Sequence, residues 1–306
     1  MIVKVLGSAA GGGFPQWNCN ARSSRLAWDR DARAIPRTQS SIAISADGTK
    51  WVLVNASPDI RQQILATPEL HPVRAGPSRN SPIIAVLLTN GDIDHIAGLL
   101  SLRERQPFRL FAHERVLSIL DRNSIFGVLA PEIVERVPLT LNDEIEIPGS
   151  GGLSVVAFSV PGKVALYLED ELKGKGLGTE TGDTIGLKIS APRSSKLLYI
   201  PGCAAVDGAI LERVKDADCL LFDGTVFTDA ELLDLSVGEK TGRRMGHIPI
   251  SGEGGSLHAF DGCAVGRKIY VHINTTNPIL ERGSAAEQRV IAAGWEIAYD
   301  GMTLSL

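Results

Sequence analysis

Cysteines are few in this chain, and their spacing argues against a disulfide-built scaffold. The 306-residue sequence has four of them, widely scattered, at Cys19, Cys203, Cys219 and Cys263. Disulfide frameworks belong mainly to short secreted chains. Residues 1–6 run straight into glycines, without the longer apolar stretch and small-residue cleavage site of a secretory signal. We therefore expect reduced thiols and a cytoplasmic protein.

Long apolar runs and basic clusters are also missing. The longest apolar run, residues 83–88, is strand-sized and far below the ~18–20 residues that a membrane-spanning helix needs. The 31 basic and 35 acidic residues give a net charge of −4, with no basic block or stripe. We therefore expect neither a membrane nor a nucleic acid as partner. The content of 44% hydrophobic and 22% charged residues is typical of a globular protein with a large core.

Short β-branched runs separated by Gly, Pro and Asp dominate both ends of the sequence, and they predict strands. The run at 83–88 has no polar alternation, which predicts a strand covered on both faces. Strands are predicted at 1–6, 41–45, 51–55, 83–88, 109–112, 153–158, 164–168, 184–189, 196–200, 219–223, 268–272, 295–299 and 302–306. Helices are predicted at 59–66, 96–105, 114–121, 208–217 and 284–293.

This order of elements occurs twice, and each half ends in helices. Two sheets packed face to face, with helices outside both, satisfy such an order. No linker marks a domain boundary, so the sequence predicts one α/β domain over residues 1–306, a four-layer αββα sandwich. Residues 169–182 are rich in Lys, Glu and Gly without apolar periodicity, which predicts a mobile hairpin tip.

The strongest local signal for chemistry is the run from Thr89 to His95, directly after the buried strand. Ligand-binding loops of α/β folds follow the carboxyl ends of such strands. Here Asn90, Asp92, Asp94 and His95 place an amide, two carboxylates and an imidazole on one loop. A helix cap explains one aspartate but leaves the other and the histidine unexplained. The pattern therefore favours a metal site.

Two further histidines and a glycine-rich turn are candidates for the same cleft. His272 ends a predicted strand beside a polar loop, and His247 lies in a loop bounded by Gly246 and Pro249. The turn at residues 7–13 lacks both the Gly-Lys-Ser/Thr ending of a phosphate loop and the spacing of a dinucleotide fingerprint. We expect this turn to border the cleft, with backbone N–H groups available to a substrate carboxylate.

Five stretches that follow one another along the chain carry a resemblance to a known family. They are Gly7–Cys19 with Phe14-Pro15-Gln16-Trp17-Asn18, Ser57-Pro58-Asp59-Ile60-Arg61, the Asp94-His95 loop, Gly246-His247-Ile248-Pro249-Ile250-Ser251, and His272-Ile273-Asn274-Thr275-Thr276-Asn277-Pro278. Together they closely resemble the pyrroloquinoline quinone (PQQ) biosynthesis protein B family over essentially the whole chain. The resemblance implies the metallo-β-lactamase fold.

The resemblance also implies a ligand set. Hydrolases of that superfamily carry His-x-His-x-Asp-His, where the first two histidines serve one metal ion and the Asp-His pair serves another. The same frame here reads Asn90-x-Asp92-x-Asp94-His95. The site for the first ion has therefore lost its imidazoles. The site for the second ion keeps Asp94 and His95, and the superfamily's late histidine corresponds to His272.

Two histidines and one carboxylate with open positions are the ligands of non-haem Fe(II) oxygenases, whereas two zinc ions require a nitrogen-rich site. The family role that the resemblance implies is an iron-dependent hydroxylase. It adds oxygen from O2 to the tyrosine ring of a small Glu–Tyr-derived PQQ precursor, beside other PQQ biosynthesis proteins. Fe(II) is the expected ion, with zinc possible in the protein as purified. A zinc hydrolase and a non-catalytic carrier of PQQ or its precursor remain alternatives.

Other positions receive roles from the same resemblance. Asn90 and Asp92 are expected to support the ligands, or Asp92 to be a further ligand. His247 and Asp92 are the candidate catalytic residues, with His247 expected to carry a proton. Asp223 is a candidate to orient a ligand histidine. Cys203 falls where relatives place a bridging ligand, so a ligand and a buried thiol are both open.

One departure from the family concerns a structural zinc. Family members usually show Cys-x-Cys-x-x-Cys after the Trp-Asn pair, a spacing that resembles a zinc knuckle. This chain keeps Cys19 but has Ala21 and Ser24 in the other two places. We therefore expect no structural zinc at Cys19.

Overall fold

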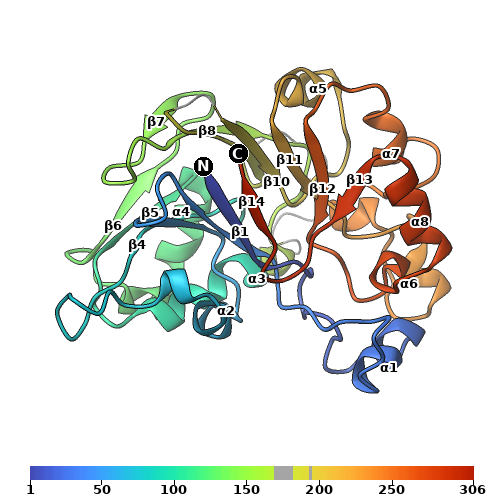
Figure 1. Ribbon diagram of the computed structural model, residues 1–306, viewed down its shortest axis with the longest axis horizontal. Helices are drawn as coiled ribbons and strands as arrows, with labels where there is room; N and C mark the ends of the chain where they lie inside the picture. Colours follow the sequence, from blue (N-terminus) through green and yellow to red (C-terminus); the bar gives the residue numbers. More distant parts are fainter. Residues whose placement is uncertain (169–181, 193–194) are drawn as a thin grey trace.

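Two sheets, each of seven strands within the described residues, form the centre of the fold (Figure 1). The computed structural model describes residues 1–168, 182–192 and 195–306. The first sheet has the order β14 (Thr303–Ser305), β1 (Ile2–Gly7), β2 (Ser41–Ser45), β3 (Trp51–Val54), β4 (Ile83–Leu87), β5 (Phe108–Ala112) and β6 (Val134–Pro138). The second has the order β13 (Trp295–Ile297), β12 (Arg267–Val271), β11 (Cys219–Asp223), β10 (Lys196–Ile200), β9 (Ile185–Ser190), β8 (Ser154–Ser159) and β7 (Glu144–Glu146).

Helices cover the outer face of each sheet (Figure 1). Along the first half of the chain the helices are α1 (Arg22–Trp28), which packs beside the second half of the chain, and α2 (Ile60–Ala66), α3 (Ile93–Ile96) and α4 (Glu114–Arg122). Along the second half they are α5 (Gly208–Val214), α6 (Glu231–Asp234), α7 (Ser256–Ala259) and α8 (Ala285–Ala292). The predicted arrangement of two facing sheets with helices outside both is confirmed. No helix among the described residues is long and apolar enough to cross a membrane.

The alternation of side chains along each strand explains the layers. Ile42 and Ile44 point into the cluster between the two sheets, whereas Ala43 between them joins the cluster under the outer helices. In β4, Leu87 faces the other sheet and Val86 faces the helices. Both faces of these strands are therefore buried, as the unbroken apolar run at 83–88 predicted.

Strand direction decides where a site can form. Strands β3 to β6 run parallel to one another, and so do β10 to β13. The carboxyl ends of parallel strands lie at one edge of a sheet, where loops are free to bear ligand groups. The loops after β4, β11 and β12 meet at this edge, because His272 after β12 contacts both Asp94 and Thr225.

Some predicted elements differ from the structure. The helix predicted at 96–105 is instead α3 followed by a 3-10 helix, Ala97–Leu102. Within it, Gly98 packs against the backbone of Ser57 too closely for any side chain. The strand predicted at 164–168 is wrong: its end is a 3-10 turn, Leu166–Leu168. Strands β6 and β7 were not predicted, and the predicted hairpin tip at 169–182 lies almost entirely outside the described residues.

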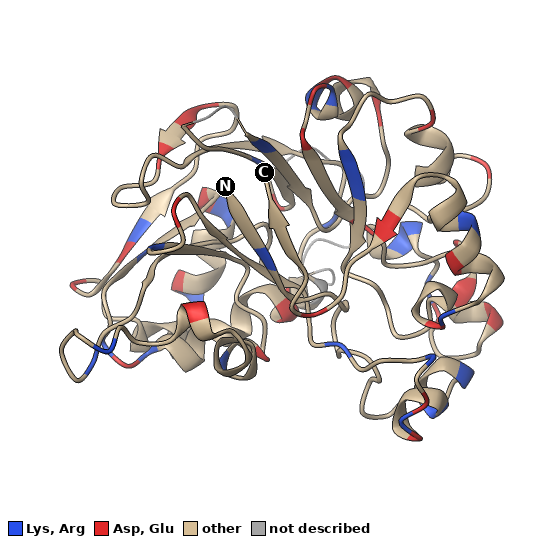
Figure 2. Cartoon of the chain, in the orientation of Figure 1, with Lys and Arg blue, Asp and Glu red and all other residues tan. Residues whose placement is uncertain are grey.

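Basic and acidic residues are interspersed along the elements of both halves (Figure 2). Among them are ion pairs such as Arg22–Glu281 and Arg267–Glu296. Arg22, in α1, pairs with Glu281 just after a 3-10 helix, Pro278–Leu280, and so ties the first residues of the chain to its last quarter.

Candidate metal centre

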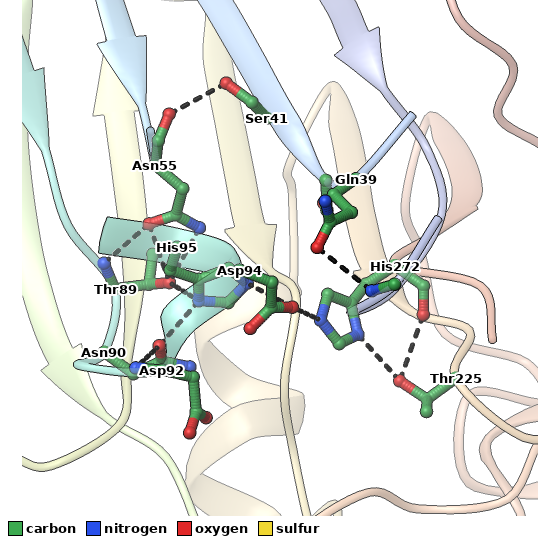
Figure 3. A network of polar contacts seen from close by, with 12 residues as sticks. Gln39, Ser41, Asn55, Thr89, Asn90, Asp92, Asp94, His95, Thr225 and His272 are labelled. Carbon is green, nitrogen blue, oxygen red and sulfur yellow. Dashed lines mark hydrogen bonds and ion pairs between the residues drawn. The ribbon is translucent and has the colours of Figure 1, made fainter. Parts of the chain in front are cut away.

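The loop after β4 brings an aspartate and a histidine to the sheet edge. Asp92 precedes α3, so Asp94 and His95 lie within that short helix. Asn55, which follows β3, holds the loop through hydrogen bonds with Thr89: its Oδ1 accepts the Thr89 backbone N–H at 2.9 Å, and its Nδ2 donates to Thr89 Oγ1 at 3.0 Å. The loop is thereby anchored to the neighbouring strand (Figure 3).

Asn90 sets the orientation of the His95 ring. Asn90 Oδ1 accepts the Asp92 backbone N–H at 3.0 Å, which identifies this atom as the amide oxygen. The same oxygen lies 2.6 Å from His95 Nδ1, so Nδ1 carries the ring proton and donates it to Asn90. The Nε2 atom is left with a lone pair. Asn90, Asp94 and His95 are called the first-sheet side below.

The second sheet contributes His272, directly after β12. Its backbone has φ of 57°, a left-handed conformation that residues other than glycine seldom adopt. Thr225 Oγ1 lies 2.8 Å from His272 Nδ1, and Asp94 Oδ2 lies 3.0 Å from His272 Nε2. The left-handed backbone of His272 is a feature often found at functional sites. Asp223, Thr225, His247 and His272 are called the second-sheet side.

Asp94, His95 and His272 therefore converge. One ligand atom from each lies within 4.8 Å of the others, and the two imidazole centroids are 5.3 Å apart. Ligand atoms bound at about 2.1 Å to one tetrahedral ion lie roughly 3.4 Å apart, so a modest adjustment lets all three bind the same ion. The two rings are close enough to share a cation.

An orphaned polar atom fits a metal at this point. His95 Nε2 is buried and has no hydrogen-bond partner among the described residues, and it lies 3.8 Å from Asp94 Oδ2. Native proteins seldom leave a buried polar atom unpaired without a reason, and a role in binding a metal ion is one such reason. A bare imidazole nitrogen beside a carboxylate is a suitable donor pair for a divalent cation.

Burial and charge together set the protonation states. Burial lowers the pKa of His95 below its ordinary value, against the pull of Asp94, and keeps this ring neutral. Burial opposes ionisation of Asp94, but the charges of His95 and His272 and the hydrogen bond with His272 outweigh it and lower the Asp94 pKa. Burial by itself lowers the pKa of His272. The hydrogen bond with Asp94 and the charges of Asp94 and Asp223 have the larger, opposite effect, so the pKa of His272 is raised above its ordinary value.

A second group of donors adjoins the first, formed by Asp223, His247 and His272. Asp223 is fully buried, and its Oδ2 lies 2.7 Å from His247 Nδ1 and accepts the Cys203 backbone N–H at 2.9 Å. The His247 ring stacks on His272 with centroids 5.2 Å apart. The Asp223 carboxylate therefore already has partners and serves to orient His247.

Two predicted candidates lie apart from the converging atoms. Asp92 borders the same cleft but belongs to neither group of three donors found among the described residues. Figure 3 shows its carboxylate apart from the contact between Asp94 and His272. The Cys203 thiol donates to the Ala205 carbonyl at 3.0 Å, and burial raises the pKa of the thiol. The geometry supports the buried-thiol alternative for Cys203.

A cleft of about 510 Å³ opens beside the three converging residues. The glycine-rich turn borders it through Ala10 and Gly11, as the sequence predicted. Sequence reasoning missed Thr225, Lys163 and Lys240. The cleft is lined by Ala10, Gly11, Asn90, Asp92, Asp94, Lys163, Thr225, Leu232, Gly238, Glu239, Lys240, Met245, His247, His272 and Asn274. The position of Thr225 just after a buried strand was the one available signal, since that is where Asp94 also lies.

The N-terminal segment shows what stands in the place of the knuckle cysteines. Cys19 is a free, half-buried thiol. Ser24 is buried, and its hydroxyl lies 3.1 Å from Thr275 Oγ1, in the loop that follows His272. The Cys19 carbonyl accepts the Trp28 indole N–H at 3.2 Å. Hydrogen bonds therefore tie this segment to the loop after His272.

Comparison with known proteins agrees with the resemblance. Residues 50–273 match the profile of the β-lactamase superfamily domain. The sequence is 53% identical over 303 residues to coenzyme PQQ synthesis protein B of Methylobacterium sp. (strain 4-46), covering 99% of each chain. It is 50% identical over 306 residues to the protein of that name from Xanthomonas oryzae pv. oryzae (strain MAFF 311018), covering 100% of each.

Solved structures give the same picture. The structure is similar to Zn(2+)-bound PqqB from Methylobacterium extorquens, with a TM-score of 0.96, 53% identity and 100% coverage of both chains. A diphosphatase of the PhnP family has a TM-score of 0.68 at 19% identity, covering 99% of this chain and 96% of its own, which reflects the shared fold alone. The predicted metallo-β-lactamase sandwich is confirmed.

Proposed function

The chain belongs to the coenzyme PQQ synthesis protein B family of the β-lactamase superfamily, and on that premise we propose that it is an iron-dependent hydroxylase of PQQ biosynthesis. Its substrate is a small Glu–Tyr-derived precursor, and each hydroxylation of its tyrosine ring takes one oxygen atom from O2 while two electrons from an external reductant convert the other to water. The observation that carries this proposal is the donor set of two imidazoles and one carboxylate, His95, His272 and Asp94, beside an open cleft.

The donor set favours one ion. A second ion on the pattern of the superfamily hydrolases would need imidazoles at positions 90 and 92, which here carry Asn90 and Asp92. The Asn90 oxygen is already occupied by His95 and by the Asp92 backbone. The other group of donors shares His272 with the first and uses an Asp223 carboxylate that accepts several hydrogen bonds. One ion held by two histidines and a carboxylate is the arrangement of non-haem Fe(II) oxygenases.

The residues of this chain then have defined tasks. Asp94, His95 and His272 would hold the ion, and bound Fe(II) supplies the means to activate O2 for insertion into an aromatic ring. His247 borders the cleft, and Asp223 engages its Nδ1, so Nε2 is the atom that accepts the phenolic proton. Asn90 orients His95. Asp92 is the candidate for a further ligand or proton carrier.

Two lysines on the cleft wall, which also carries Asp92, Asp94 and Glu239, are suited to pair with carboxylates of the precursor. Lys163 and Lys240 both line the cleft. The Lys163 stem packs over Gly246, next to His247, where an added side chain would come within 3.0 Å of Lys163 Cγ. Ammonium groups attract carboxylates, and a Glu–Tyr-derived compound carries several. The product would pass to other PQQ biosynthesis proteins.

Reconstitution tests the proposal. The protein is stripped of metal, loaded anaerobically with Fe(II) or with Zn(II), and given the Glu–Tyr-derived precursor with ¹⁸O2 and ascorbate as the two-electron reductant. We expect a product that carries labelled oxygen with Fe(II) and none with Zn(II), the ion named for the Methylobacterium extorquens structure.

Other outcomes of this experiment contradict the proposal. Cleavage of an ester or phosphodiester by the zinc form indicates a hydrolase. Tight binding of precursor or PQQ to the iron form without any product indicates a carrier. Product mass separates the hydroxylase from both alternatives.

A further inference from the structure

Thr225 lies where the two histidines of the second-sheet side meet. It follows β11 by two residues, and 4% of it is exposed. Its hydroxyl oxygen is 2.6 Å from Asp223 Oδ1, 2.8 Å from His272 Nδ1, 3.0 Å from the His272 carbonyl and 3.1 Å from His247 Nδ1. Figure 3 shows this hydroxyl beside both the ring and the backbone of His272. One side chain therefore touches every member of that side.

A hydroxyl has one proton to donate, which limits the possible pattern. Asp223 Oδ1 and the His272 carbonyl can only accept. The carboxylate is the nearer and the charged acceptor, so the Thr225 proton goes to Asp223. The remaining lone pairs of Thr225 Oγ1 face His272 Nδ1, which must then carry a proton and donate it. Without a metal, His272 Nε2 donates to Asp94 Oδ2 at 3.0 Å, and it gives up this proton when it binds a metal ion.

Asp223 imposes the same form on His247. Its Oδ2 lies 2.7 Å from His247 Nδ1 and is an acceptor, so that nitrogen also carries a proton. The backbone N–H groups of Cys203 and Thr225 donate to the two oxygens of Asp223 and hold the carboxylate in place. A single buried carboxylate thus orients both rings, His247 directly and His272 through Thr225.

We propose that Thr225 is a positioning residue that links the metal ligand His272 to the proton carrier His247 through Asp223. Its hydroxyl keeps His272 in the form with a proton on Nδ1, so that Nε2 faces Asp94 and the metal. This inference rests on the proposed metal centre but not on the hydroxylation. A centre that holds zinc without any oxygenase activity would leave it intact.

Zinc affinity tests the role of the hydroxyl. Zn(II) is titrated against a competing chelator in the wild-type protein and in Thr225→Val and Thr225→Ser. Valine keeps the branched shape but has no hydroxyl, so we expect zinc binding about 10- to 100-fold weaker, the usual result of removing a partner that orients a ligand histidine. Serine keeps the hydroxyl, and its affinity is expected to be that of the wild type.

Thr184→Val is the matched control. Thr184 is also buried, and its hydroxyl donates to the Lys163 carbonyl rather than to a histidine or to Asp223. This variant loses one hydroxyl hydrogen bond of the same kind, and we expect it to bind zinc as the wild type does. Circular dichroism and thermal unfolding check that each variant is folded.

A second measurement needs no substitution. Long-range ¹H–¹⁵N spectra of the zinc-loaded wild-type protein report which nitrogen of each histidine carries the proton. We expect the Nδ1–H form for both His247 and His272. An unprotonated His272 Nδ1 would overturn the inference, as would a folded Thr225→Val variant with wild-type affinity or a Thr225→Ser variant as weak as the valine variant.

Discussion

The two sides of the metal centre are built in different ways. The first-sheet side comes from one loop, in which Asn90, Asp94 and His95 follow a single strand. The second-sheet side is assembled from three separate segments. They are the end of β11 with the residues after it, the residue after β12, and the loop that contains His247. A compact sequence motif can therefore be recognised directly, whereas the opposite side depends on the whole fold to bring its atoms together.

Removal of His95 should have the largest effect. His95→Ala deletes one of the three proposed ligands, so the loss of zinc affinity should exceed the roughly 100-fold upper range for loss of an orienting partner. The ring bonds mainly to Asn90 within its own loop, so the fold should remain. Chelator competition and circular dichroism measure both. His258→Ala, at an exposed histidine in α7, is the control. Wild-type affinity in His95→Ala would break the assignment of the first-sheet side.

Glu231 tests how the second-sheet side is held together. This buried carboxylate in α6 accepts hydrogen bonds from the Phe227 backbone and from Thr276, in the loop after His272. Burial raises its pKa to about 7 from 4.5, against the lowering effect of those hydrogen bonds. The folded protein therefore binds this proton more tightly than the unfolded chain does. The resulting stability is full below pH ~4.5 and is lost as the pH rises through ~7.

Glu231→Gln should remove this pH dependence. Between pH 4 and pH 8 the wild type should lose about 3 kcal/mol more unfolding free energy than the variant, an upper figure from the pKa difference. Urea unfolding at several pH values measures it. Parallel pH profiles for the two proteins would mean that Glu231 ionises normally and that the loop after His272 is held by other contacts.

Asn90 is the counterpart of Thr225 on the first-sheet side. Asn90→Ala removes the oxygen that accepts the His95 Nδ1 proton, so zinc binding should weaken about 10- to 100-fold. Asn90→Asp keeps an acceptor in the same place and should retain most of the affinity. If the alanine variant binds zinc as the wild type does, the loop backbone alone orients His95. The two sides would then orient their histidines in different ways, although both histidines have a hydrogen-bond partner at Nδ1.

Much of the fold followed from local pattern. Buried strands such as β2, β3 and β4 have unbroken or alternating apolar runs, and their bounds were predicted to within a residue. The missed strands β6 and β7 lie at sheet edges, carry charged residues and, in β6, include Pro138. Charges and proline are features of edge strands, and they weaken the pattern from which a strand is recognised.

The candidate site divides in the same way. Asp94 and His95 stood out because four polar groups crowd one short loop. His272 was a candidate from its position at the end of a predicted strand, and the resemblance to the family gave its role as a ligand. The one signal for Thr225 was its position just after a buried strand, and it was missed because threonine is common at such positions. Its role comes from the parallel pairing of β11 with β12, in which Asp223 lies opposite Val271 and the following residues meet.

The location of the ion is the most direct test of the account. Crystals loaded with Fe(II) or Zn(II) can be measured at the absorption edge of each metal. We expect a single ion about 2.0–2.2 Å from an Asp94 oxygen, from His95 Nε2 and from His272 Nε2. An ion bound elsewhere, at Cys19 or between Asp223 and His247, with His95 Nε2 unbound, would contradict it.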